Sequence, residues 1–258
     1  MSNDSTLKTV FVALAVCLVC SIFVSIAAVM LKPQQVINKR LDKQQNILKV
    51  AGLFEEGRDI KELFEKVEAK IVNLETGEFV EDMDPASYDM RKAAGDPEMS
   101  SKIPADEDIA SIRRRPDNVT VYFVTEGDKA GMMILPVNGY GLWSTLYGFI
   151  ALEPDGQTVY GISFYEHAET PGLGGEVDNP KWKSLWQGKK VFDENGEPAL
   201  EVVKGTVDAA TPNAEHKVDG LAGATLTSRG VSNLVHYWMG EQGYAAFLTK
   251  QRSRPSSY

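Results

Sequence analysis

The sequence contains only two cysteines, Cys17 and Cys20, and both lie in an apolar segment near the N-terminus. The remainder of the chain therefore has neither a disulfide nor a thiolate metal site available to it. The three histidines, His167, His216 and His236, are far apart in the sequence and form no local metal-binding motif. We therefore predict no metal site on this chain.

The common nucleotide-binding signatures are also missing. Gly139 and Gly141 begin a Gly-x-Gly, but no glycine follows three positions later, so the dinucleotide-binding fingerprint is absent. The sequence has no P-loop and no His-Glu-x-x-His. Its formal net charge of -9 disfavours nucleic acid as a partner, because phosphate backbones are bound by basic surfaces.

An uncharged run without proline extends from Thr9 to Leu31. At about 1.5 Å per residue, a helix of this length can cross a hydrocarbon core of about 30 Å. A cleaved signal peptide is the alternative, but its apolar region is usually only about 7–15 residues long. We expect a retained, single-pass transmembrane anchor that contacts membrane lipid.

Local patterns predict helices before and after a strand-rich middle. The expected helices are a stalk at Gln35–Val50, then Arg58–Leu74, Ser228–Met239 and Tyr244–Lys250. In Arg58–Leu74, five apolar residues recur at helical spacing, namely Ile60, Leu63, Phe64, Val67 and Ile71. Gly240 stands where a glycine commonly ends a helix.

The middle of the chain favours strands. Gly77–Ala105 is acidic and rich in turn residues, which is typical of a long loop. Two hairpins follow, the first from Val119–Thr125 and Met132–Val137, the second from Leu146–Leu152 and Thr158–Tyr165, with a further strand at Val202–Val207. Because no βαβ rhythm repeats, we expect an α+β fold with an antiparallel-rich sheet.

The most informative segment is DGLAGATLTSRG, residues 219–230. Gly223 and Ala224 let backbone N–H groups approach an anion, and the following helix adds the positive end of its dipole. Thr225, Thr227 and Ser228 offer hydroxyls at the same place. An ordinary helix start capped by Thr227 or Ser228 is the alternative, and local chemistry alone favours it.

DGLAGAT resembles the flavinylation motif of the FMN-binding domain family. The resemblance implies that an FMN transferase joins FMN to the Thr225 hydroxyl through a phosphoester. Asp219, Gly223 and Ala224 would complete the motif, and Thr227 would lie beside the cofactor.

Two further segments are similar to the same family. The stretch HAETPGLGG, residues 167–175, resembles its Glu-Thr-Pro-Gly-Leu-Gly loop, although a plain surface turn is the alternative. Residues 139–145, GYGLWST, resemble its glycine- and tryptophan-bearing segment, although core packing explains Trp143 equally well. The contacts implied for the flavin ring are Glu169 and Thr170 by hydrogen bonds, Gly172 and Gly174 by close approach, and Leu142, Trp143 and Leu173 by apolar packing.

The anchor, stalk, acidic insert and length together resemble the C subunits of the Na⁺-translocating NADH:quinone reductases. That likeness implies an electron relay within a respiratory complex that transports Na⁺, with subunits B, D and E as partners and no complete active site on this chain. The alternatives are a G-type subunit of an Rnf electron-transport complex and a membrane module that binds a phosphorylated ligand reversibly.

The resulting domain organisation has four parts: a tail at residues 1–8, the anchor at 9–31, a stalk and acidic region at 32–118, and the FMN-binding domain at 119–258. The basic residues after the anchor would place the soluble part in the cytoplasm if counted simply. The family's transferase, however, acts on the outer side of the bacterial cytoplasmic membrane. We therefore expect a periplasmic domain, since a long exported domain can override flanking charges.

Overall fold

The structure of the protein is a computed structural model that describes residues 5–253. It divides into two compact units, residues 1–43 and residues 44–258. Part of the expected tail at residues 1–8 lies outside the described residues, and the part from Thr6 onward is helical.

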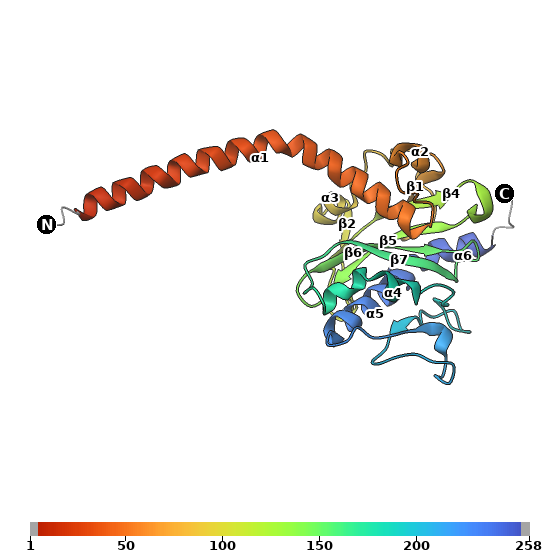
Figure 1. Cartoon of the computed structure of the whole chain (residues 1–258). Helices are drawn as coiled ribbons and strands as arrows, with labels where there is room; N and C mark the ends of the chain where they lie inside the picture. Colours follow the sequence, from red (N-terminus) through yellow and green to blue (C-terminus); the bar gives the residue numbers. More distant parts are fainter. Residues whose placement is uncertain (1–4, 254–258) are drawn as a thin grey trace. The chain divides into compact units, whose positions relative to one another are not determined.

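Helix α1 covers Thr6–Val50 and is drawn in red to orange in Figure 1. It contains both the run predicted as an anchor and the segment predicted as a stalk helix. Among the described residues, it is the one helix long and apolar enough to cross a membrane, and none of its most apolar window is buried by protein. Such a long unburied apolar stretch is what contact with lipid requires.

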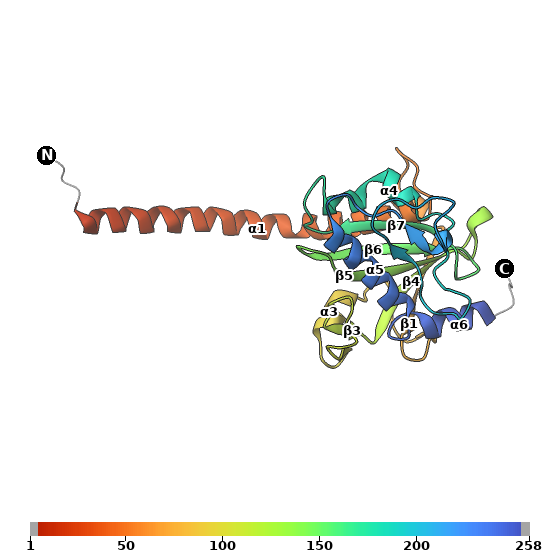
Figure 2. The ribbon, with the colours of Figure 1, turned by 90° about the horizontal axis from the view of Figure 1, so that it is seen from below.

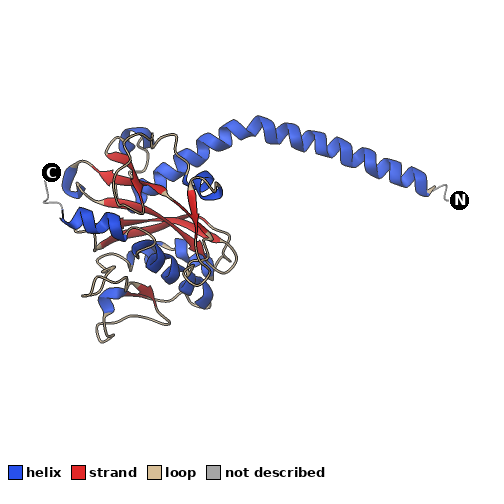
Figure 3. Cartoon of the chain, turned by 180° about the vertical axis from the view of Figure 1, so that it is seen from behind, coloured by secondary structure: helices blue, strands red, loops and turns tan. Residues whose placement is uncertain are grey.

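The second unit is built on a five-stranded antiparallel sheet with the order β1-β4-β5-β6-β7. Its strands, red in Figure 3, are β1 (Val67–Asn73), β4 (Asn118–Val124), β5 (Met133–Tyr140), β6 (Thr145–Leu152) and β7 (Val159–Glu166). Both predicted hairpins are confirmed, because β4 pairs with β5 and β6 pairs with β7. The α+β prediction is confirmed with them.

Each face of the sheet has its own hydrophobic core. Val121 of β4 and Leu135 of β5 lie in the core covered by α5 (Thr225–Met239) and α6 (Ala245–Ser253). Their neighbours Tyr122 and Ile134 lie in the other core, with α2 (Ile60–Phe64) and the last turn of α1. Side chains of successive strand residues point to opposite faces, so this alternation fills both cores. Figures 1 and 2 show α5 on one face of the sheet and the end of α1 on the other.

The helix predicted at Arg58–Leu74 is wrong. Helix α2 covers only Ile60–Phe64, and β1 begins at Val67 and pairs with β4 over its whole length. Val67, Ala69 and Ile71 also recur at the two-residue period of a strand, so the segment fits a strand as well as a helix. Pairing with the distant β4, which local periodicity cannot reveal, selects the strand.

Several short elements also differ from the predictions. The expected loop Gly77–Ala105 contains α3 (Met90–Gly95) and β2 (Ser100–Lys102), which pairs with β3 (Arg114–Pro116). The strand expected at Val202–Val207 is reduced to β8 (Glu201–Val202), which runs parallel to β9 (Lys217–Val218). The other short elements are α4 (Pro180–Ser184) and the 3₁₀ turns η1 (Gly127–Lys129), η2 (Gly174–Asp178) and η3 (Ala214–His216).

Helix α5 begins three residues earlier than predicted, at Thr225. Neither Thr227 nor Ser228 caps it: Ala224 occupies the N-cap position and contributes no side-chain hydrogen bond. Both hydroxyls make other hydrogen bonds, to Glu169 and to the backbone of Leu221 respectively. The helix ends as expected before Gly240, whose N–H donates to the His236 carbonyl at 3.0 Å, and the predicted last helix is confirmed as α6.

Candidate functional site

Three chain segments meet beside the N-terminus of α5. Residues 139–145 join β5 to β6, residues 167–175 follow β7, and residues 219–224 lead into the helix. Because Tyr147 of β6 is paired with Glu166 of β7, the first two segments leave the sheet at the same end of the strands. Sheet pairing therefore brings two of the three motifs together, and the hydrogen bond from Thr227 to Glu169 joins the start of α5 to them.

Glu169 joins these segments through four hydrogen bonds. Its Oε1 accepts from the backbone N–H groups of Leu142 (3.1 Å), Trp143 (2.9 Å) and Ser144 (3.2 Å). Its Oε2 accepts from the hydroxyl of Thr227, in the first turn of α5, at 2.7 Å. The residue is only 5% exposed. One buried carboxylate thus fixes the 139–145 loop and the helix relative to each other.

The ionised form of Glu169 is the stable one. Burial by itself would raise the pKa of this carboxyl, but hydrogen bonds from Thr227 and from the backbone of Trp143, Ser144 and Leu142 outweigh it, so the pKa lies below its ordinary value. Three of the donors share Oε1, and Oε2 accepts only from Thr227. Glu169 is therefore suited to positioning the loops, and its expected hydrogen bond to a flavin edge stays a prediction.

Two glycines allow the close approach to Glu169. A Cβ added at Gly141 would lie 2.6 Å from Oε1 of Glu169, and one at Gly174 would lie 2.6 Å from both Oε2 and the Thr227 hydroxyl. The space at Gly174 is thus filled by the protein itself. Gly172 differs: its φ of +75° needs glycine, and an added Cβ would meet open space. Of the two glycines expected to admit a ring, Gly172 is the one beside free volume.

Thr225 is exposed at the very start of α5. The turn before it uses Gly223 in a left-handed conformation (φ +71°), where a Cβ would lie 2.9 Å from Leu173. The Ser228 hydroxyl accepts the backbone N–H of Leu221 at 3.1 Å, which closes the turn onto the helix. With no side chain capping α5, the positive end of its dipole faces outward beside the Thr225 hydroxyl.

Asp219 anchors the start of the motif to a neighbouring segment. Its Oδ1 accepts the backbone N–H of Val207 at 2.8 Å, and its backbone carbonyl accepts the indole N–H of Trp182 at 2.8 Å. A further backbone hydrogen bond joins Gly220 N–H to the carbonyl of Gly205 at 2.9 Å. The segment at 203–207 is therefore held alongside the motif.

Four large apolar side chains are exposed around this helix end. Their exposed fractions are 38% for Leu142, 66% for Trp143, 44% for Leu173 and 51% for Leu226. Trp143 is therefore not core packing, which was the alternative interpretation. Exposed apolar side chains that come from separate segments and gather at one place are typical of a binding site. The predicted contact Thr170 is also exposed, and its backbone carbonyl accepts the N–H of Leu173 at 3.1 Å.

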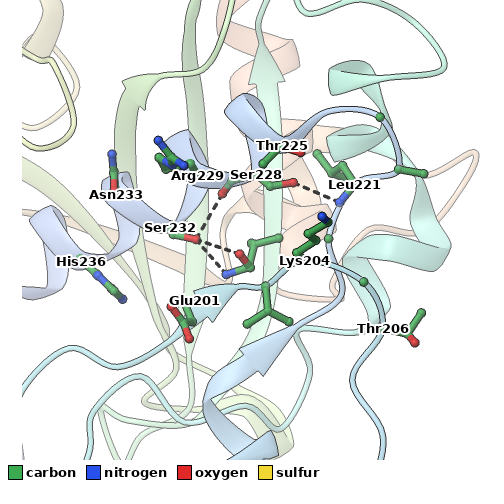
Figure 4. A pocket seen from close by; sticks show the side chains of 16 residues that line it. Glu201, Lys204, Thr206, Leu221, Thr225, Ser228, Arg229, Ser232, Asn233 and His236 are labelled. Carbon is green, nitrogen blue, oxygen red and sulfur yellow. Dashed lines mark hydrogen bonds between the residues drawn. The ribbon is translucent and has the colours of Figure 1, made fainter. Parts of the chain in front are cut away.

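A pocket of about 750 Å³ opens on another side of Thr225, between α5 and the segment at 201–206 (Figure 4). Its lining includes Thr225, Lys204, Arg229, Asn233 and His236, and none of the four exposed apolar side chains. Burial lowers the pKa of His236 despite the nearby Glu201, so its imidazole is neutral at pH 7.

Two cationic residues of the pocket, Lys204 and Arg229, were not predicted from the sequence. Arg229 lies inside the motif segment, where its position four residues after Thr225 on a helix was a usable signal. Lys204 lies 21 residues before Thr225, in a segment whose position depends on the β8–β9 pairing. No local sequence pattern indicates it.

Comparison with known proteins agrees with this geometry. A family model described as FMN-binding domain matches residues 141–240, which include Glu169 and Thr225. The chain is 55% identical to the C subunit of a Na⁺-translocating NADH-quinone reductase from Pseudomonas aeruginosa, over 97% of this chain and 98% of the relative. It is 52% identical to the protein of the same name in Vibrio vulnificus, over 97% of each.

This chain belongs to the family of Na⁺-translocating NADH:quinone reductase C subunits. The crystal structure of Shewanella oneidensis NqrC has the same fold, with a TM-score of 0.77 and 37% identity over 84% of this chain and all of that one. The residues present fit an FMN: an uncapped helix end beside a free hydroxyl suits a phosphate, and the exposed apolar side chains suit an aromatic ring.

Proposed function

We propose that this chain relays electrons through one FMN joined by a phosphoester to Thr225, as one component of a Na⁺-pumping NADH:ubiquinone reductase. The observation that carries the proposal is the position of Thr225, exposed at the uncapped start of α5 within a match to the FMN-binding domain. A phosphate there would meet unpaired backbone N–H groups and the positive end of the helix dipole.

Attachment requires a group transfer onto the Thr225 oxygen. The hydroxyl oxygen forms a bond to the FMN phosphorus of FAD, the bond from that phosphorus to the AMP oxygen breaks, and AMP leaves. The hydroxyl proton passes to a base of the FMN transferase. We assign Asp219 a role in recognition by the transferase, in addition to its hydrogen bond with Val207.

The residues of the chain then hold and position the cofactor. Leu142, Trp143 and Leu173 supply apolar contact for the ring, with Gly172 leaving room beside it. Glu169 keeps the loop that carries Leu142 and Trp143 fixed against α5. When bound, FMN supplies one- and two-electron redox chemistry.

The proposal includes a membrane setting and partners. Helix α1 anchors the chain in the bacterial cytoplasmic membrane, and the second unit lies on the periplasmic side, where the transferase acts. Subunits B, D and E of the complex are the proposed neighbours in the electron path. The full-length matches to quinone reductase C subunits favour this complex over the Rnf alternative.

A denaturing gel tests the covalent flavin directly. The full chain expressed with an FMN transferase should give a fluorescent band that withstands acid precipitation. Thr225→Ala should abolish the band and Thr225→Ser should retain it, because serine keeps the hydroxyl. Thr206→Ala, which removes another hydroxyl from the same pocket, is the matched control and should stay fluorescent. Colour that acid removes completely would instead support the reversible phospholigand module.

A further inference from the structure

The pocket beside Thr225 follows one face of α5. Thr225, Ser228, Ser232 and His236 all line it, and their spacing of three or four residues places them on one side of the helix. The opposite wall is the segment at 201–206, and Figure 4 shows the two walls facing each other. Over the 11 residues from Thr225 to His236, the helix advances about 16 Å.

Charge is distributed unevenly along this pocket. Glu201 lies at the His236 end, where its negative charge acts on the imidazole. Lys204 lies toward the opposite end, because its Cα would be 3.4 Å from a Cβ added at Gly220, in the turn before Thr225. Arg229 is one helical turn after Thr225 and lines the same pocket. Lys204 and Arg229 therefore come from the two walls of the pocket (Figure 4), and the carboxylate of Glu201 is at the end nearer His236.

Neither cation is used for an internal ion pair. Within residues 5–253, the salt bridges engage other lysines and arginines, such as Arg91 with Glu166, and not Lys204 or Arg229. Both side chains are exposed and line a hollow surface. Two unpaired cations beside an uncapped helix end make a region of positive potential at the Thr225 hydroxyl.

We propose that Lys204 and Arg229 bind the phosphate of the flavin on the pocket side of Thr225, while the ring lies against the apolar side chains outside the pocket. The two are positioning residues, since they hold the phosphate and do not react. The ligand identity rests on the proposed function, but the anion-binding role rests on the pocket itself. The arrangement separates a charged subsite from an apolar one, with Thr225 between them.

A pair of flavins that differ only in the phosphate tests this inference. The full chain carrying Thr225→Ala, which cannot be esterified, is titrated in detergent with FMN and with riboflavin, and binding is followed by flavin fluorescence anisotropy. Lys204→Gln and Arg229→Gln should each weaken FMN binding by about 2- to 5-fold, as expected for an exposed charge pair. Riboflavin binding should change by less than that, and added salt should weaken FMN binding less in the variants.

Matched controls exclude a general charge effect. Lys102→Gln, in β2, and Arg58→Gln, which loses only its exposed pairs with Glu55 and Glu62, remove a cation outside the pocket and should leave FMN affinity unchanged. Thermal unfolding of every variant checks that the fold is intact.

The inference would be overturned by an unchanged FMN-to-riboflavin affinity ratio in both pocket variants. It would also be overturned if the Thr225→Ala chain showed no saturable FMN binding up to about 1 mM. Failure of the proposed function gives a different result: FMN binds in a manner that depends on Lys204 and Arg229, yet no covalent flavin forms on a chain that retains Thr225.

Discussion

Replacing Glu169 should weaken the domain by an amount that depends on pH. Each hydrogen bond to a buried charged group contributes about 1.5–3 kcal/mol. Leu142 and Trp143 are exposed enough for water to replace the carboxylate at their N–H groups, so we count only the bonds from Ser144 and Thr227 in full. Glu169→Ala should then lower the free energy of unfolding by about 3–6 kcal/mol.

Glu169→Gln is the more informative substitution. Its carbonyl can still accept the three backbone N–H groups, and its amide can donate to the Thr227 hydroxyl. The number of hydrogen bonds is kept while the charge is lost, so the cost at pH 7 should be about 1–2 kcal/mol.

The direction in which pH changes the stabilisation by Glu169 follows from the lowering of its pKa in the folded protein. The folded protein holds the pKa of Glu169 below its ordinary value of 4.5, so the ionised carboxylate stabilises the fold above that pH. This contribution is lost as the pH falls through the lowered pKa. The difference in stability between wild type and Glu169→Gln should therefore shrink steadily below about pH 4.5.

Urea unfolding of the full chain in detergent, followed by tryptophan fluorescence across this pH range, measures the effect. Glu166→Gln is the matched control, because Glu166 is 49% exposed and pairs with Arg91 at the surface, so its loss should cost less than about 1 kcal/mol. Equal midpoints for wild type and Glu169→Gln at pH 7, or a difference that persists unchanged to pH 3, would refute the reasoning.

Three further predictions concern the site and the orientation of the chain. Gly174→Ala should destabilise the domain by about 1–3 kcal/mol in the same urea assay, because its Cβ would enter the contact of Glu169 with α5. The control is Gly95→Ala, whose Cβ meets open space and should not destabilise the domain. Equal effects of the two substitutions would contradict this prediction. Glu194→Cys, an exposed site, should react with a membrane-impermeant maleimide in intact spheroplasts, and labelling only after lysis would contradict a periplasmic domain. Asp219→Asn keeps an acceptor for the Val207 N–H, so it should cost less than about 1 kcal/mol of stability. The same substitution should slow flavin attachment by the transferase. An unchanged rate of flavin attachment would exclude a role of Asp219 in recognition.

Elements specified by local patterns were predictable from the sequence. The strands β4 to β7 are short, largely apolar runs separated by turn residues, and α5 has an apolar face of the right spacing, so their existence needed no knowledge of partners. The strand β1 was not predictable in this way. Its residues fit either structure, and only the pairing with β4, about 50 residues away, selects the strand.

The candidate site likewise contains residues found from local motifs and residues that only contacts between distant segments bring to the site. Thr225, Asp219 and the Glu-Thr-Pro-Gly-Leu-Gly loop were found because each is a short contiguous motif. The positioning role of Glu169 was not found, because its four donors come from segments 25 to 58 residues away. The cation at Lys204 likewise reaches the site only through the β8–β9 pairing.

Peptide mapping by mass spectrometry tests the central claim most directly. The chain, purified from cells that contain its FMN transferase, should show an intact mass increased by one FMN less one water, and fragmentation should place the whole increment on Thr225. Loss of the increment in Thr225→Ala, with its retention in Thr206→Ala, completes the expected result. An unmodified Thr225 in a chain matured with an active transferase, or an increment on another residue, would contradict the account.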